Sequence, residues 1–294
     1  MELRALEHFV AVVDAGGFTR AAAKLRVAQP GVSAQVRNLE RELGQALFER
    51  HARGATLTAA GRTALPHARA ALASAAAVAD DVAALTGLLR GTLRVGMLLS
   101  SSGMQMPALL REFRDLAPAV ELRVTEDDAA NLLVAVREGT LDVAWTATAD
   151  RDLDDLAGIT VAHEPLAALV ATDHRWARRR TVTLAELCGE PLLSVPPGGG
   201  LRTVLEETCA AHGLTYRVAL EANSPVLLAS LAAQGLGVAL VPASFADSST
   251  GGTVHPLRIV RPGLVGRVQV LWRRENPSPA TRAFTRLVTR TTHG

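Results

Sequence analysis

Polar side chains between residues 29 and 53 have the types and spacing needed to contact DNA. One buried stripe along a helix is predicted by the i, i+4 and i+7 spacing of Val32, Val36 and Leu39. This stripe leaves three polar side chains facing outward, Ser33, Gln35 and Arg37. Hydroxyl, amide and guanidinium groups are the donors and acceptors that pair with base edges in the major groove. The candidate chemistry is therefore hydrogen bonding to DNA.

The elements around this helix are those that would position it on DNA. A short preceding helix has a small apolar face formed by Ala21, Ala22 and Leu25, and Val27 and Ala28 lie in the turn between the two. Pro30 suits a first helical position, where its missing N–H costs nothing. An earlier apolar stripe over residues 3–13 ends at Gly16 and Gly17 and would brace both helices. This is helix-turn-helix geometry, in which the second helix enters the major groove.

The segment after this unit predicts a wing. Residues 49–58 combine turn residues with short extended pieces, which is typical of a small β-hairpin. Arg50 and Arg53 would then contact phosphates or the minor groove. Residues 1–60 hold eight Lys and Arg against six Asp and Glu, and the whole chain has a net charge of +2. A non-specific nucleic-acid coat is usually more basic, so the balance favours specific, dimer-dependent binding.

Residues 58–90 predict a long linker helix. A 3-4 spacing is followed by Leu65, Ala68, Leu72, Ala75, Ala79, Val82 and Leu89. Such a seam of small residues lets two helices approach closely, as in a coiled coil. The alternative is an ordinary helix packed on its own chain. Pro66 is expected to bend the helix near its start.

After Gly91 and Thr92, predicted strands and helices alternate, which indicates an α/β domain with largely parallel strands. The predicted strands are 93–97, 120–125, 141–146, 166–171, 192–195, 216–221, 238–240 and 267–272. The predicted helices are 107–116, 129–138, 184–187, 201–212, 225–234 and 280–290.

Ligands of such sheets gather where the carboxyl ends of strands and helix N-termini converge. The residues at these ends form a candidate effector site, made of Ser100, Ser101, Ser102, Thr146, Gly198, Arg202 and Asn223. Apolar walls would come from Leu98, Leu99, Met104 and Trp145. Their donors suit a small carboxylate with an apolar part, and neutral ligands stay open. Helix capping alone would explain one serine of the three, and Arg202 would serve equally in a surface ion pair.

Enzymatic chemistry is not indicated. The chain lacks GxSxG, HExxH and GxxxxGK[ST], and the eight histidines are scattered. Gly235-Leu236-Gly237 precedes a predicted strand instead of following one, so it cannot cradle a phosphate. We expect no catalytic residue, no metal site and no cofactor. Cys188 and Cys209 are expected to be buried or partly buried thiols in a reducing cytoplasm. The N-terminal segment does not resemble a signal peptide, and the protein is expected in the cytoplasm, associated with the nucleoid.

Many residues of the first 61 occur in the fixed order of one family. They are Leu6, Phe9, Phe18, Thr19, Ala21, Ala22, Leu25, Gln29, Pro30, Ser33, Leu39, Glu40, Leu43, Gly44, Leu47, Phe48, Arg50, Leu57, Thr58 and Gly61. On these residues the chain resembles the LysR-type transcriptional regulators, and the remainder follows the family's layout more loosely. The DNA-binding residues then expected are Thr19, Arg20, Gln29, Pro30, Ser33, Gln35, Arg37, Arg50 and Arg53.

The resemblance implies a winged helix-turn-helix domain over 1–57, a dimerising linker helix over 58–90 and an effector domain over 91–294. The effector domain would resemble a periplasmic solute-binding protein. Its two α/β subdomains, about 91–162 with 268–294 and about 163–267, would be joined by two crossover strands. Ser100 aligns with a Ser or Thr that commonly touches the inducer in this family. Some peroxide-sensing members use a cysteine pair, but the residues around Cys188 and Cys209 do not suggest one.

The expected function is regulation of transcription by a homodimer or homotetramer on a dyad-symmetric double-stranded DNA site. A small-molecule effector between the subdomains would change their relative orientation. The resemblance leaves room for RNA polymerase as a further partner. Two alternatives stay open: a regulator that works without an effector, and an α/β solute-binding or enzymatic protein with an incidental helix-turn-helix. A ligand screen separates the first alternative, and the absence of catalytic motifs argues against the second.

Overall fold

The computed structural model describes residues 1–51, 54–84, 89–98, 106–148, 153, 155–248 and 252–293. It divides into two compact units, residues 1–90 with 137–140 and residues 91–136 with 141–294. Ser100, Ser101, Ser102 and Arg53 lie outside the described residues, as do Leu99 and Met104. No helix of the described part is long and apolar enough to cross a membrane.

Three helices build the first unit around one apolar core: α1 (Leu3–Ala15), α2 (Phe18–Leu25) and α3 (Gln29–Leu43). Gly16 ends α1 in the left-handed conformation, with φ 66°, and its N–H bonds to the last turn. The predicted stripe is buried as expected, since Val32, Val36 and Leu39 are at most 1% exposed. Phe48 packs edge-on against both Phe9 and Phe18, with ring centroids 5.4 Å apart in each pair.

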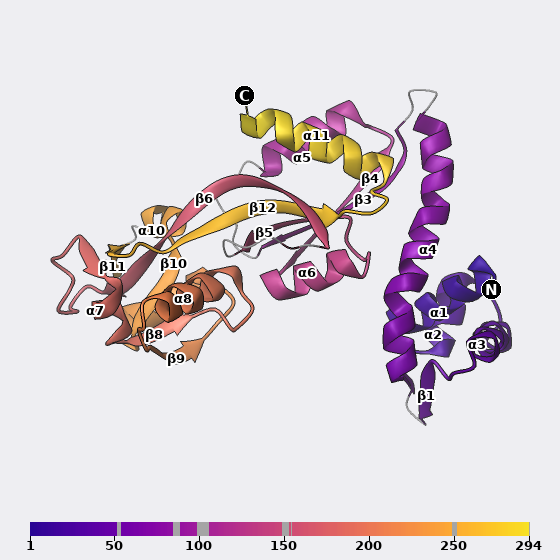
Figure 1. Cartoon of the computed structure of the whole chain (residues 1–294), viewed down its shortest axis with the longest axis horizontal. Helices are drawn as coiled ribbons and strands as arrows, with labels where there is room; N and C mark the ends of the chain where they lie inside the picture. Colours follow the sequence, from indigo (N-terminus) through magenta and orange to yellow (C-terminus); the bar gives the residue numbers. More distant parts are fainter. Residues whose placement is uncertain are drawn as a thin grey trace. The chain divides into compact units, whose positions relative to one another are not determined.

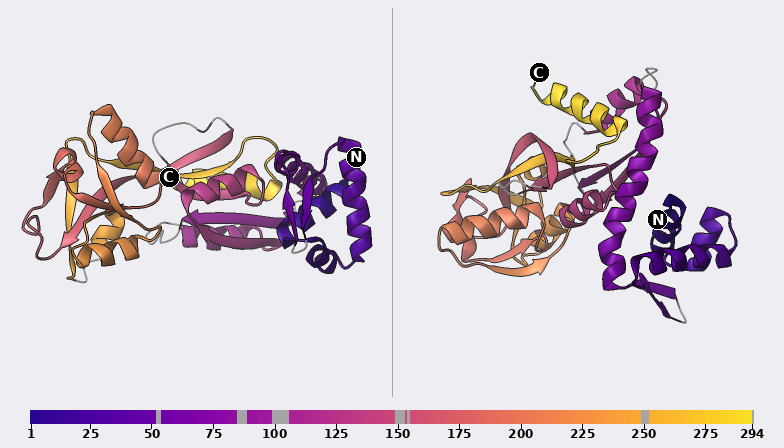
Figure 2. Two further views of the ribbon diagram at one scale, coloured as in Figure 1. Left: turned by 90° about the horizontal axis from the view of Figure 1, so that it is seen from below. Right: turned by 45° about the vertical axis from the view of Figure 1, so that its right-hand side comes forward.

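The wing hairpin consists of β1 (Phe48–His51) and β2 (Gly54–Leu57), which pair antiparallel beside the N-terminal end of α4 (Ala59–Ala84) (Figure 2). Glu40 ties α3 to this hairpin because its Oε1 accepts hydrogen bonds from the N–H groups of Leu47 (2.9 Å) and Phe48 (3.3 Å). Thr58 begins α4 by accepting from the N–H of Gly61 at 3.0 Å.

The helix α4 only partly follows the predicted seam. Leu65 and Ala68 are buried in the core of the first unit, and Leu72 packs against it, so this stretch binds its own chain. Further along, Val78 and Val82 are 64% and 60% exposed. The helix also continues through Pro66. The first half of α4 therefore packs on its own chain, and the second half presents an exposed apolar edge.

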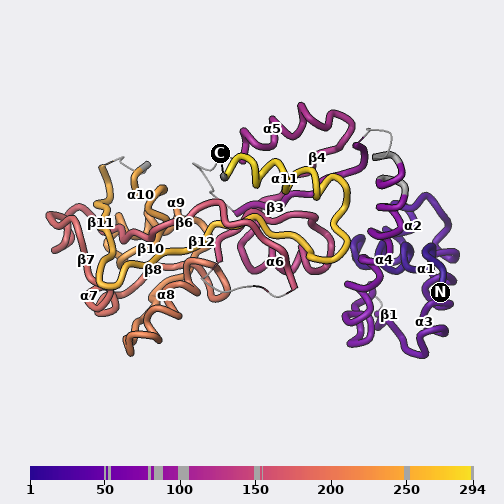
Figure 3. Tube along the Cα trace, turned by 45° about the horizontal axis from the view of Figure 1, so that its top comes forward, coloured from indigo at the N-terminus to yellow at the C-terminus, as the bar shows by residue number. Residues whose placement is uncertain are grey.

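The second unit is a mixed sheet of strand order β4-β3-β5-β12-β6-β10-β8-β9, with β11 and β7 attached beside β6 (Figure 1). Its first half contains β3 (Gly91–Leu98), α5 (Met106–Leu116), β4 (Val120–Asp127), α6 (Ala129–Arg137), β5 (Val143–Thr148) and α11 (Pro279–His293). Helices α5 and α11 cover one face of these strands and α6 the other (Figures 1 and 3). Phe113 of α5 packs edge-on against Phe284 of α11 at 5.3 Å.

The second half contains β7 (Thr181–Thr183), α7 (Leu184–Cys188), β8 (Pro191–Ser194), α8 (Gly200–Ala211), β9 (Arg217–Glu221), α9 (Pro225–Ala233), β10 (Val238–Pro242), α10 (Ala243–Ser248) and β11 (Val254–Val260). Two long antiparallel strands, β6 (Leu156–Ala171) and β12 (Val265–Arg273), pass between the halves. Alternate residues of β6 face two cores, since Ala168 packs with α7 and α8 and Leu169 with α9 and α10.

Each predicted strand and helix of this unit overlaps an observed one, but the strand directions are mixed instead of largely parallel. Both crossover strands run antiparallel to their neighbours β5 and β10, and this geometry joins the two halves. Four parts of the unit were not predicted from the sequence: β7, β11, α10 and the first ten residues of β6.

Candidate nucleic-acid interface and effector pocket

The solvent-exposed side of α3 lies opposite its buried stripe. It presents Pro30, Ala34, Arg37, Asn38 and Arg41, all of which are exposed. Positions 30, 34, 37 and 41 recur every three to four residues, so they form a single row along the helix. Arg41 is held by a hydrogen bond to Asn38 Oδ1. The row carries two guanidinium groups, and Asn38 beside it adds one amide; such groups read bases and bind phosphates.

Ser33 is not part of this exposed row. It is 4% exposed, and its hydroxyl accepts a hydrogen bond from Arg37 Nη1 at 2.8 Å. The physical reason is that Ser33 lies three residues before Val36, on the flank of the buried stripe, and therefore faces the body of the unit. Ser33 instead positions the exposed Arg37 side chain. Gln35, also predicted to face outward, is half-buried.

The remaining predicted DNA contacts are exposed where the structure describes them. Thr19, Arg20, Gln29 and Pro30 lie at the N-terminal ends of α2 and α3. Arg20 Nη2 donates to the carbonyl of Gly16 at 2.7 Å. Arg50 belongs to β1, and its side chain is outside the described part. Ala34, Asn38 and Arg41, which are exposed on the same side of α3, were not among the predicted contacts, although a step of half a turn away from the buried stripe points to them.

A cavity of about 180 Å³ lies where the two halves of the second unit meet. Leu98, Asp127, Asp128, Ala129, Ala130, Asn131 and Ala147 contribute to it from the first half. Glu164 and Val268 come from the crossover strands, and the second half supplies Val195, Pro196, Pro197, Gly199, Gly200, Leu201, Asn223, Pro225, Pro242, Ser244 and Phe245. The size and the largely apolar lining suit a small organic molecule.

Of the predicted effector contacts, Asn223 and the wall residue Leu98 line this cavity. Gly198 directly precedes the lining residues Gly199 and Gly200, and a Cβ added to it would be 3.5 Å from Ala130 Cβ. Trp145 is buried but not among the lining residues.

Thr146 is fully buried and is not among the lining residues either. It neighbours the lining residue Ala147 on β5, so the alternation of the strand turns its side chain to the opposite face. Its hydroxyl has no hydrogen-bond partner among the described residues.

Arg202 does not line the cavity either, contrary to the prediction. Its Nε lies 2.8 Å from Glu206 Oε1, its Nη1 lies 3.2 Å from Glu221 Oε1, and its guanidinium stacks over the Tyr216 ring at 5.6 Å. The carboxylates of Glu206 and Glu221 and the ring of Tyr216 thus hold the Arg202 guanidinium beside α8. The structure thus shows ion pairs, as the alternative proposed, but Arg202 is only 9% exposed, so they are not surface ion pairs.

The charged side chains of the cavity are acidic. Asp127, Asp128 and Glu164 line it, and the described lining contains no Lys, Arg or His. Asp128 Oδ1 accepts from the N–H of Asn131 at 2.9 Å and so caps α6, while Glu164 Oε1 accepts from the N–H of Ser244 at 2.9 Å. The N-terminal ends of α6 and α10 therefore already hold carboxylates of the chain itself.

This acidic lining is a feature that the sequence analysis missed. The signal was present, because Glu126-Asp127-Asp128 follows directly on the predicted strand 120–125. The strand-end reasoning that selected the serines applies equally to these carboxylates.

Cys188 and Cys209 lie together in the core of the second half, with their Sγ atoms 3.5 Å apart and both thiols free. The C-terminal end of α7 and the inner face of α8 bring them together, which their spacing in the sequence did not indicate. Burial raises the pKa of the Cys188 thiol and raises that of Cys209 to about 12. Because the thiolate is the reactive form, both groups are poor nucleophiles at neutral pH.

Comparison with known proteins covers nearly the whole chain. Residues 3–62 match the bacterial regulatory helix-turn-helix protein, lysR family, and residues 86–292 match the LysR substrate binding domain. The HTH-type transcriptional regulator ShiR of Corynebacterium glutamicum (strain R) is 33% identical over 258 residues, which cover 87% of this chain and 87% of ShiR.

Solved structures of full-length regulators resemble the whole chain as well. A full-length OxyR from Pseudomonas aeruginosa superposes with a TM-score of 0.78 at 27% identity, covering 98% of this chain and 94% of that one. Full-length CbnR complexed with its target DNA has a TM-score of 0.65 at 28% identity, covering 99% and 100%. These relatives regulate transcription and are not enzymes. The chain therefore belongs to the LysR family of DNA-binding transcriptional regulators.

Proposed function

We propose that this regulator binds a dyad-symmetric site as a homodimer or homotetramer, and that a small effector in the cavity at the junction of the two halves controls that binding. The observation that supports an effector most directly is which parts of the chain line the cavity. Both halves and both crossover strands supply it. A ligand there contacts groups that move relative to one another when β6 and β12 flex, so it binds one arrangement better than the other.

The proposal is tested on the intergenic DNA beside the protein's own gene. Fluorescence anisotropy and footprinting, with and without fractions of a metabolite extract, should show protection of two half-sites and an affinity that changes with one fraction. Footprinting that protects a single half-site would contradict dimeric binding. Protection that no fraction alters would favour the alternative of a regulator without an effector.

Assembly is proposed to use the exposed second half of α4. Val78 and Val82 are one turn apart on one side of this helix, and burial of a valine side chain contributes about 1.5–3 kcal/mol. Val82→Glu would place a carboxylate in the seam of each chain. The dissociation constant of the dimer should therefore rise at least about tenfold. Leu72 is a poorer probe because it already packs on its own chain.

Sedimentation equilibrium of the full chain measures this effect. Ala76→Glu is the matched control, because Ala76 is exposed and lies on the opposite side of α4. Equal dissociation constants for Val82→Glu and wild type would place the dimer contact elsewhere.

A further inference from the structure

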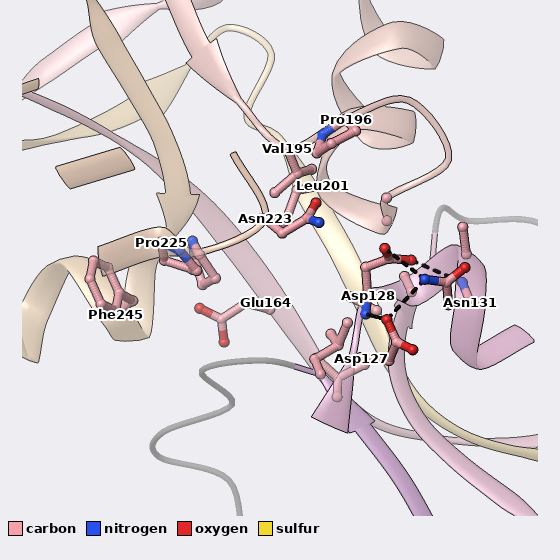
Figure 4. Close-up of a pocket in the computed structure, with 18 of the residues that line it drawn as sticks. Asp127, Asp128, Asn131, Glu164, Val195, Pro196, Leu201, Asn223, Pro225 and Phe245 are labelled. Carbon is pink, nitrogen blue, oxygen red and sulfur yellow. Dashed lines mark hydrogen bonds between the residues drawn. The ribbon is translucent and has the colours of Figure 1, made fainter. Parts of the chain in front are cut away.

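The effector cavity is asymmetric in its chemistry. Its apolar wall includes Leu98, Leu201, Phe245 and Val268, whereas its charges are those of three carboxylates. Figure 4 shows Glu164 between Pro225 and Phe245 on one side and Asp127 and Asp128 on the other. Residues 99–105, which follow the lining residue Leu98, contain no Lys, Arg or His. A ligand anion would therefore meet negative charge without a compensating cation from the described lining.

Each carboxylate uses part of its accepting capacity within the chain. Asp127 Oδ1 accepts from the N–H of Asp128 at 2.8 Å and from Asn131 Nδ2 at 2.9 Å, and Glu164 Oε1 accepts from Ser244. These bonds fix both carboxylates in place. A carboxylate has about four lone-pair sites, so the second oxygen of each stays able to accept from a donor in the cavity.

A bare metal ion is a poor match for this site. Among the described residues, no group of three or more His, Cys, Asp and Glu side chains is arranged to hold one. Divalent cations demand several oxygen ligands at short range. The apolar wall would make no favourable contact with such an ion, whereas it would bury the hydrocarbon part of an organic ligand. The volume of about 180 Å³ holds on the order of a dozen water-sized groups, which is the size of a small organic molecule.

We propose that the effector is a small organic cation, an amine with a compact apolar or aromatic body, and that Asp127 and Glu164 are the residues that select its charge. This inference rests on the proposed function and specifies its ligand class. The ammonium group would lie against the carboxylates and the body against Phe245 and Leu201. Asp127 ends β4 in the first half and Glu164 lies on the crossover strand β6, so the cation would lessen the repulsion between parts of the chain that must approach when the cavity closes.

The test uses compounds of one shape and three charges on the full-length protein. Phenethylamine, 2-phenylethanol and phenylacetate form one such set, and cyclohexylamine, cyclohexanol and cyclohexanecarboxylate form a second. Thermal unfolding and titration calorimetry should show that at least one amine stabilises the protein more than its alcohol and its carboxylate do. Magnesium chloride alone should not reproduce this stabilisation.

Variants assign the charge selection to the cavity. Glu164→Gln and Asp127→Asn keep an oxygen that can accept the existing backbone hydrogen bond and remove one negative charge each. Each variant should bind the amine about tenfold more weakly, since a charge-assisted hydrogen bond is lost. Glu207→Gln is the matched control, because Glu207 is exposed on α8 outside the cavity, and it should bind the amine as wild type does.

The inference is overturned if no amine stabilises the protein, if a carboxylate stabilises it as well as its matched amine, or if Glu164→Gln and Asp127→Asn bind the amine as wild type does. A carboxylate that binds in the cavity would overturn only the ligand class and leave the proposed effector control standing. Dimeric binding to the intergenic site, measured without any compound, tests the proposed function separately.

Discussion

Ala34→Glu is expected to abolish specific DNA binding while the protein stays folded. Ala34 is exposed in the middle of the row formed by Pro30, Arg37 and Arg41 on α3. A carboxylate there would oppose the phosphates and base acceptors of the groove. It would also attract Arg37 and Asn38, which are one turn away, and so withdraw them from DNA. We expect a loss of about a hundredfold or more, which corresponds to about 2.8 kcal/mol.

The fold should tolerate the change because glutamate is a good helix former and an exposed site costs only a few tenths of a kcal/mol. Fluorescence anisotropy on the intergenic fragment at fixed salt measures the affinity, and circular dichroism measures the unfolding temperature. Ala210→Glu adds the same charge at an exposed position of α8 and should change neither quantity. A tenfold change in the dissociation constant corresponds to about 1.4 kcal/mol. If the dissociation constant of Ala34→Glu for DNA stays within about threefold of the wild-type value, this row does not face DNA.

The buried stripe of α3 was predictable because one regular period fixes it. Val32, Val36 and Leu39 are buried as their spacing indicated, and α3 begins at Gln29 with Pro30 in its first turn. Ser33 shows the limit of this reasoning. Its burial depends on how the flank of α3 packs in the unit, which a helical period alone does not specify. A polar residue beside a buried stripe can face either way, and here the Arg37 hydrogen bond accompanies burial.

The second unit was predictable as alternating strands and helices but not as a sheet. The direction of a strand depends on tertiary pairing, and β6 and β12 pair with partners far away in the sequence. The residues that line the cavity were hard to predict for the same reason, because they too depend on tertiary packing. The cavity does lie at strand ends, where a candidate site was predicted, but strand alternation at Thr146 and ion pairs at Arg202 leave these two side chains out of its lining. The charge in the cavity comes from Asp127, Asp128 and Glu164, which were not among the predicted site residues.

Gly200→Ala is expected to damage the effector cavity and to leave DNA recognition intact. A Cβ added to Gly200 would lie 2.1 Å from the carbonyl oxygen and 2.5 Å from the carbonyl carbon of Ala147. These are backbone atoms of β5, so the strand and the start of α8 must separate to make room. Alanine would ordinarily stabilise a helical position by up to about 1 kcal/mol relative to glycine. Steric overlap with a fixed backbone exceeds that gain, because overpacking typically costs about 1–3 kcal/mol and sometimes more.

The separation would act directly on the cavity, because Gly199, Gly200 and Leu201 form one of its walls and Ala147 another. We expect the unfolding temperature of the α/β unit to fall by about 5 °C or more, since about 1 kcal/mol shifts a domain of this size by roughly 2–4 °C. Differential scanning calorimetry measures the fall, and anisotropy below the transition should give wild-type DNA affinity. Gly263→Ala is the matched control, because its added Cβ would come no closer than 3.5 Å to Ile259 O. Equal unfolding temperatures for Gly200→Ala and Gly263→Ala would show that α8 and β5 are not packed this closely and that the wall can yield, in which case the cavity would admit ligands larger than its present volume.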